Sequence, residues 1–248
     1  MTDIVYEHPL NEKIRTYLRL EYLFAQLKQL QSLNDEVQQQ CFFNVLFDLI
    51  EVLERNDVRP ELIKDLERCE SQLVLWSKHP SVSDSKLQVL LQQAVRLQSE
   101  LLRSGKLVGT LKDDKFLAPL RQRFSIPGGS CYFDMPQLQY WIHLDAPLRQ
   151  KMAADWLQQI QLTQQAIQLV LRFVRERSAF SDALAENGFY QQNAEHYELL
   201  RLSYNNELAV YPTISGNRYR YAIRFMQLCD ELSRSACDKD IPFKLACC

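Results

Sequence analysis

The residue pattern best suited to chemistry is an alternating run of arginines near the C-terminal end. Residues 218–226 read Arg-Tyr-Arg-Tyr-Ala-Ile-Arg-Phe-Met. Successive side chains of a β-strand point to opposite faces, so a strand here places Arg218, Arg220 and Arg224 on one face. A guanidinium group binds a carboxylate through two parallel hydrogen bonds. The pattern is therefore typical of a binding face for an acidic partner, and equally of a half-buried strand whose arginines are solvated.

The opposite face of this run suits a protein core, because its side chains are Tyr219, Tyr221, Ile223 and Phe225. Residues 215–217, Ser-Gly-Asn, precede the run and form a turn signal, since glycine and asparagine tolerate a positive φ. Residues 208–211 come before the turn and are a candidate partner strand. The sequence thus predicts a β-hairpin with one apolar and one cationic face.

Nucleophilic and metal chemistry find little support in the sequence. None of the histidines has the spacing of a metal-binding helix; they are His8, His79, His143 and His196. Cys131 and His143 are a candidate thiol–imidazole pair, but other cysteines suit such a pair equally well. We therefore expect no catalytic residue, no metal ligand and no cofactor. The alternative is a cysteine-dependent enzyme or redox switch that uses Cys131, Cys247 or Cys248.

Composition excludes several classes of protein. The chain has 248 residues, 46% of them hydrophobic, and can bury a sizeable core. Its formal net charge of −2 argues against general nucleic-acid binding, which needs a strongly basic surface. We also expect no membrane span, because no apolar run approaches about 18 residues. The odd cysteine number and the lack of an N-terminal signal pattern indicate the cytoplasm.

Hydrophobic periodicity predicts helices first and strands last. Helical spacing and capping signals mark residues 11–31, 36–55, 60–78, 84–101, 112–124, 136–144 and 147–177. Short strand-like runs follow at residues 188–190, 199–204, 208–213, 218–228 and 243–247. We therefore expect an α+β protein, with a mainly helical domain over residues 1–180 and a smaller, largely antiparallel β domain over residues 181–248. Residues 131–134 are a further candidate strand for the β part.

Blocks along the whole chain resemble one protein family. They are Glu7-His8-Pro9-Leu10-Asn11-Glu12-Lys13, Arg15-Thr16 with Leu18-Arg19, Arg121-Gln122-Arg123 with Ser125-Ile126-Pro127-Gly128-Gly129, Asn187-Gly188-Phe189-Tyr190-Gln191, Leu200-Arg201-Leu202, Tyr211-Pro212 with Ile214-Ser215-Gly216, Ala222-Ile223-Arg224-Phe225-Met226 and Leu245-Ala246-Cys247-Cys248. In this order and spacing, they resemble the bacterial cell-division protein family ZapD.

The resemblance implies a non-enzymatic cytoplasmic factor of the mid-cell division ring. Such a protein binds the C-terminal tail of FtsZ through basic residues between its two domains. It crosslinks FtsZ filaments as a homodimer, and the helical domain is the expected dimerising part. Together with the arginine run, the resemblance implies these tail-binding residues: Arg15, Arg19, Lys115, Arg218, Arg220 and Arg224.

Overall fold

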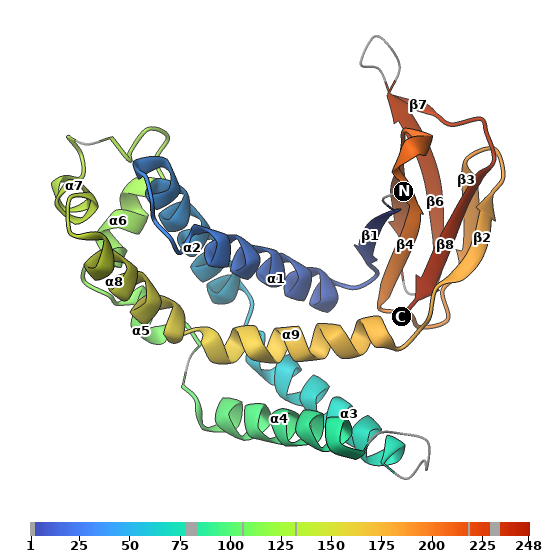
Figure 1. The fold of residues 1–248 in the computed structure, drawn as a ribbon, viewed down its shortest axis with the longest axis horizontal. Coiled ribbons are helices and arrows are strands. Elements are labelled where there is room, and N and C mark those ends of the chain that lie inside the picture. The colour runs from blue at the N-terminus through green and yellow to red at the C-terminus, as the bar shows by residue number, and fades with distance from the viewer. Residues whose placement is uncertain (1–2, 78–83, 106, 132, 218, 229–233) are drawn as a thin grey trace. The chain divides into compact units, whose positions relative to one another are not determined.

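The fold is α+β, as predicted, and is known here from a computed structural model (Figure 1). The structure describes residues 3–77, 84–105, 107–131, 133–217, 219–228 and 234–248. The chain divides into two compact units. A helical unit comprises Arg19–Val170, and a β unit combines Met1–Leu18 with Leu171–Cys248. The β unit therefore includes residues from both ends of the chain.

The helices account for most of the chain before residue 177. They are α1 (Glu12–Leu30), α2 (Glu36–Arg55), α3 (Arg59–Trp76), α4 (Asp84–Arg103), α5 (Gly109–Lys112), α6 (Leu117–Phe124), α7 (Pro136–Ile142), α8 (Ala146–Gln158) and α9 (Gln161–Glu176). Two of them begin at side-chain caps: Asn11 Oδ1 accepts from the amide of Ile14 at 2.8 Å, and Asp35 Oδ1 accepts from Gln38 at 2.8 Å. Such caps satisfy amides that have no partner within the helix. The predicted helices over residues 11–31 and 36–55 are confirmed.

The helix predicted over residues 112–124 is wrong as one element, because the chain bends between α5 and α6. Asp114 causes the break. Its Oδ1 accepts from the amides of Phe116 at 2.8 Å and Leu117 at 2.9 Å, which starts a new helix. Its Oδ2 lies 3.3 Å from Trp156 Nε1 on α8.

The single helix predicted over residues 147–177 is likewise wrong, since α8 and α9 are separate. Gln159 and Ile160 form a tight turn in which each amide donates three residues back, to Trp156 O at 3.3 Å and Leu157 O at 3.2 Å. Ile160 is buried, so the apolar spacing continues through the turn. Periodicity alone therefore could not locate this break.

An aromatic cluster forms the centre of the helical unit. The Phe43 ring lies 4.9 Å from the ring of Trp141 and 5.9 Å from that of Trp156, centroid to centroid. Phe116 stacks on Trp156 at 5.7 Å. These rings come from α2, α7, α8 and the bend before α6, so one core joins elements far apart in sequence.

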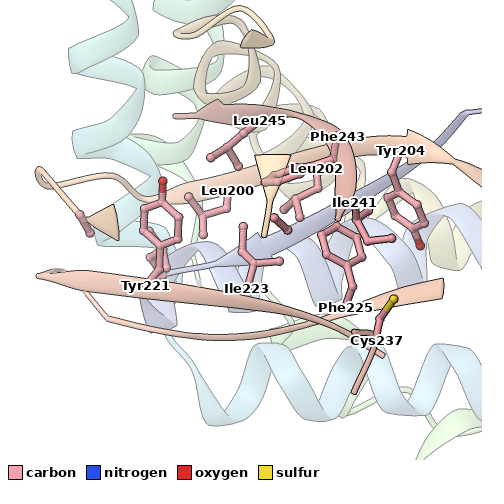
Figure 2. Close-up of a cluster of buried hydrophobic side chains, with 13 residues drawn as sticks. Leu200, Leu202, Tyr204, Tyr221, Ile223, Phe225, Cys237, Ile241, Phe243 and Leu245 are labelled. Atoms are coloured by element: carbon pink, nitrogen blue, oxygen red, sulfur yellow. The ribbon is translucent and has the colours of Figure 1, made fainter. Parts of the chain in front are cut away.

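The β unit contains two antiparallel sheets. The strands are β1 (Asp3–Pro9), β2 (Ser181–Ala185), β3 (Phe189–Asn193), β4 (Leu199–Asn205), β5 (Val210–Gly216), β6 (Arg220–Leu228), β7 (Arg234–Ala236) and β8 (Ile241–Cys247). One sheet has the order β1-β4-β8-β2, and the other has the order β3-β6-β5 with β7 also paired to β6. Figure 2 shows their apolar side chains meeting, with Phe225 of one sheet 5.5 Å from Phe243 of the other.

The strand β1 is absent from the sequence prediction. It pairs with β4 over its whole length, from Asp3 opposite Asn205 to Pro9 opposite Leu199. Strands β2 and β7 were also not anticipated. The candidate strand over residues 131–134 is wrong: Phe133 and Asp134 lie in a turn, in which the Asp134 amide donates to Cys131 O at 3.0 Å. These described residues bond locally and join no sheet.

The role of Asp114 can be tested by comparing Asp114→Ala with Asp113→Ala. The first change removes the two amide hydrogen bonds before α6 and the partner of Trp156, and should lower the free energy of unfolding by about 1–3 kcal/mol. Asp113 is exposed, so its replacement should change that free energy by less than about 0.5 kcal/mol. Urea denaturation measures both. Equal effects would show that Asp114 does not set the helix boundary.

Candidate functional site

The arginine run forms the central strand of its sheet, and its two faces separate as predicted. Tyr221, Ile223 and Phe225 are buried, whereas Arg220 and Arg224 are exposed on the opposite face. We call the surface around these two arginines the β6 arginine face. The alternation is confirmed for the described residues of β6, and Arg218 lies outside the described residues.

Tyr219 departs from the predicted alternation, because it is 61% exposed rather than buried. It lies before the strand, in a bend that Asn217 holds. The Asn217 Oδ1 accepts from the Tyr219 amide at 2.8 Å and from the Arg220 amide at 3.2 Å. The regular strand geometry therefore starts only at Arg220.

Arg224 is positioned by its neighbours on the two flanking strands. Phe189 of β3 and Thr213 of β5 stand opposite it in the register. The guanidinium carbon lies 5.0 Å from the centroid of the Phe189 ring, a cation–π contact, and Thr213 Oγ1 donates to the Arg224 carbonyl at 2.9 Å. This pair combines a positive charge with an exposed aromatic surface.

Arg220 borders a shallow hollow of about 260 Å³ on the same face. Its lining comprises Gln191, Ser215, Gly216, Asn217, Arg220, Tyr221 and Ala222. Gly216 fits tightly here, since a Cβ at this position would lie 2.9 Å from Leu10 Cδ2 and from Tyr221 Cβ. The amide, hydroxyl and guanidinium groups around the hollow are donors suited to a carboxylate.

Other basic residues of the β unit are bound to carboxylates instead. Glu7 accepts from Arg175 Nη2 at 2.7 Å and from Arg201 Nε at 3.0 Å. Glu198 accepts from Lys13 at 2.9 Å and from Arg177 at 2.5 Å. By contrast, neither Arg220 nor Arg224 forms an ion pair with any residue that the structure describes.

The pKa of Glu198 reflects its two cationic partners. Burial of the carboxyl raises the pKa, but hydrogen bonds from Lys13 and Arg177 outweigh burial and bring the pKa below its ordinary value. The ionised form is therefore the one that stabilises the folded state.

The remaining predicted basic residues are distributed over both units. Arg15 belongs to the β unit and pairs with Glu12 one turn before it on α1. Arg19 is exposed at the edge of a hollow of about 330 Å³ between α1 and α2. Lys115 is exposed in the bend between α5 and α6. Of the six predicted residues, the structure places Arg220 and Arg224 on one continuous surface.

Sequence reasoning missed the partners that surround these two arginines. Phe189, Gln191 and Ser215 lie on neighbouring strands and meet β6 only through cross-strand pairing. Phe189 and Gln191 alternate in sequence, which was the available signal for an outward face of β3.

The cysteines show no catalytic arrangement within the described residues. Burial raises the pKa of Cys247, whose Sγ lies 3.3 Å from the Tyr221 hydroxyl, and burial also raises the pKa of Cys248. A raised pKa leaves less of the nucleophilic thiolate at neutral pH. Cys131 is exposed beside a turn. Nothing in this geometry favours the cysteine-enzyme alternative.

Neither a metal site nor a membrane-spanning helix occurs in the described parts of the chain. No group of three or more His, Cys, Asp or Glu side chains there could hold a metal ion. No helix there is both long enough and apolar enough to cross a membrane.

Comparison with known proteins connects the fold to a family. The family model of ZapD, described as "Cell division protein", matches residues 18–224. This chain belongs to the ZapD family. Proteins named "Cell division protein ZapD" from Vibrio cholerae serotype O1 and Photobacterium profundum are 40% and 44% identical to it, over 100% and 98% of both chains. The protein of that name from Pectobacterium carotovorum is 40% identical over 99% of this chain and 97% of its own. ZapD membership supports a role in cell division.

Thiol reactivity should separate the exposed cysteines from those at the C-terminal end. At pH 7.5, iodoacetamide should modify Cys41 and Cys131 at least about tenfold faster than Cys247 and Cys248, whose raised pKa values reduce the thiolate fraction. Peptide mass spectrometry measures each rate, and urea at the same pH should remove the difference. Rapid modification of Cys248 in the folded protein would contradict the raised pKa of its thiol.

The Glu198 pair predicts a dependence of stability on pH. A carboxyl whose folded pKa lies below its unfolded value, near 4.5, stabilises the protein above that value and loses this contribution as the pH falls through the folded pKa. Glu198→Gln should therefore cost roughly 1–3 kcal/mol at pH 7 and much less at pH 3, measured by denaturant titration. The exposed Glu195→Gln is the control. An equal loss for Glu198→Gln at both pH values would refute the charge-based explanation.

Proposed function

We propose that this chain binds the C-terminal tail of FtsZ through the β6 arginine face and crosslinks FtsZ filaments in the cytoplasmic division ring. The observation that carries the proposal is the exposure of Arg220 and Arg224, whose guanidinium groups pair with no carboxylate among the described residues, while other arginines of the β unit do. A protein that keeps two such arginines on a sheet has donors available for an acidic partner.

The geometry suits an extended peptide with separated anchors. Arg220 and Arg224 are four residues apart on one strand, which corresponds to about 13 Å. The hollow beside Arg220 accepts a carboxylate. Phe189 and Ala222 offer apolar surface next to Arg224 for an aliphatic side chain, so the face matches the acidic and aliphatic anchors expected in an FtsZ tail.

Crosslinking requires at least two tail sites in one particle. A symmetric homodimer supplies them from a single sequence, and two linked sites bind a filament lattice far more strongly than one. We place the dimer contact on the helical unit, whose long amphipathic helices provide apolar surface. Arg15, Arg19 and Lys115 remain proposed tail contacts on the strength of the family resemblance, and Arg218 remains one as a neighbour of Arg220 in sequence.

Sedimentation of FtsZ filaments tests the proposal. The protein should pellet with filaments of full-length FtsZ but not with FtsZ lacking its tail. Arg220→Glu/Arg224→Glu should weaken tail binding at least about tenfold, since it replaces two attractive contacts with repulsive ones. Binding of the unaltered protein should also weaken with added salt, because exposed charge pairs are screened over about 8 Å at physiological ionic strength.

A matched variant controls for the change in charge. Lys239→Glu/Lys244→Glu reverses two exposed lysines of the β unit, one on β8 and one in the loop before it, neither of which belongs to the strands that form the β6 arginine face, with the same change in net charge. It should leave bundling unchanged. The arginine face is not the tail receptor if the protein pellets equally well with filaments of tail-less FtsZ. The same conclusion follows if both variants remain folded and bind the filaments alike.

A further inference from the structure

The strand β1 has an open edge. It is the outermost strand of its sheet, and no strand in the described ranges pairs with its second side (Figure 1). Three consecutive apolar side chains are exposed there: Ile4 at 36%, Val5 at 51% and Tyr6 at 38%. Because neighbouring residues point to opposite faces, apolar surface is exposed on both faces of the sheet along this edge.

Residues 3–7 of β1 lack the lysines, prolines and bulges that protect many edge strands, although Asp3 and Glu7 are charged. Natural edges carry lysines, prolines or bulges that prevent pairing with another chain. β5, at an edge of the other sheet, contains Pro212. β1 has no lysine, no bulge in its register with β4, and no proline before Pro9. Residues 3–7 of β1 are therefore competent to pair with a further strand.

The direction of the backbone hydrogen bonds along β4 identifies which backbone groups of β1 point outward. Leu199 exchanges both of its backbone bonds with Cys248, at 2.9 and 2.8 Å, so its groups point toward the β8 side. In an antiparallel sheet this direction alternates along the strand. Leu200, Leu202 and Tyr204 of β4 therefore point toward β1.

The register with β4 then gives the direction of the backbone groups of β1. The partners of Leu200, Leu202 and Tyr204 are the even-numbered residues of β1, so those residues bond to β4. The Leu10 amide donates to Glu198 O at 2.9 Å, so this even-numbered residue also bonds toward the β4 side. The amides and carbonyls of Asp3, Val5 and Glu7 consequently point to the open side.

A second copy of β1 fits this edge in one register. With Val5 opposite Val5 of the second copy, Asp3 stands opposite Glu7, and all the outward backbone groups of these residues are paired. Ile4 then stands opposite Tyr6 of the other copy, which covers exposed apolar surface twice by symmetry. A register centred on Tyr6 is poorer, because it sets Asp3 against Pro9, which has no amide donor.

Charge favours the Val5-centred register as well. Asp3 and Glu7 have the same sign, but Glu7 is held by Arg175 and Arg201, and these three residues sum to one positive charge. Odd-numbered side chains of β1 share one face, so Asp3 of the second copy lies next to this cationic group. The contact is therefore complementary.

We propose that β1 pairs in antiparallel orientation with β1 of a second copy, centred on Val5, and so joins two four-stranded sheets into one. The paired segment is only five residues long, which is well below the size of a standard interface, so the contact is weak and reversible. It is separate from the dimer contact placed on the helical unit, and it does not depend on FtsZ binding.

Disulfide trapping of the purified full chain without FtsZ tests this register. In a Cys41→Ser/Cys131→Ser background, Val5→Cys should form a linked dimer on mild oxidation, because directly opposite Cα atoms lie about 5.5 Å apart. Tyr6→Cys should link at least about tenfold less, since its two copies would lie about 8 Å apart. Mass spectrometry of the linked peptides locates each disulfide.

Two controls separate pairing from collision. Val37 is 70% exposed on α2, so Val37→Cys reports random encounters between two copies of the protein. Adding Asp3→Arg to Val5→Cys should reduce linking several-fold at low salt, since it sets an arginine beside the cationic Glu7 group, and added salt should restore the yield. The proposal would be overturned if Val5→Cys formed linked dimers no faster than Val37→Cys or Tyr6→Cys. It would also be overturned if adding Asp3→Arg left the linking of Val5→Cys unchanged.

Discussion

The β unit depends on the carboxylate of Glu7, which binds two guanidinium groups from distant parts of the chain. Arg175 lies in the last turn of α9 and Arg201 in β4, and Arg201 also donates to the Arg175 carbonyl at 3.2 Å. A partly buried charge is costly unless its hydrogen bonds are satisfied. Here one carboxylate fixes the end of a helix, a central strand and an edge strand at the same point.

This arrangement distinguishes two kinds of arginine within one unit. Arg175, Arg177 and Arg201 are engaged by Glu7 and Glu198, and their positions are explained by the fold. Arg224 contacts Phe189, but the fold supplies no carboxylate for Arg220 or Arg224 among the described residues. Ion-pair partners therefore separate structural cations from cations available for binding, which a count of basic residues cannot do.

Local patterns predicted much of the fold, whereas strands that depend on non-local pairing were missed. The helix over residues 36–55 and the alternation of β6 follow from periodicity, so they were found. β1 was missed because its seven residues acquire strand structure only through β4, far along the chain. The breaks at Asp114 and Ile160 were missed because apolar spacing continues across them. The sequence likewise indicated Arg220 and Arg224, but the residues around them belong to neighbouring strands and become visible only with the register.

The incorporation of β1 into the C-terminal sheet also determines the order in which the protein can be completed. A ribosome releases β1 before β4, and 194 residues separate Glu7 from its partner Arg201. The helical unit, formed by one continuous segment, contains all of its own residues by the time Val170 is made. The β unit can close only after β4 and β8 emerge, so β1 remains without its partner strand while the helical segment is being made.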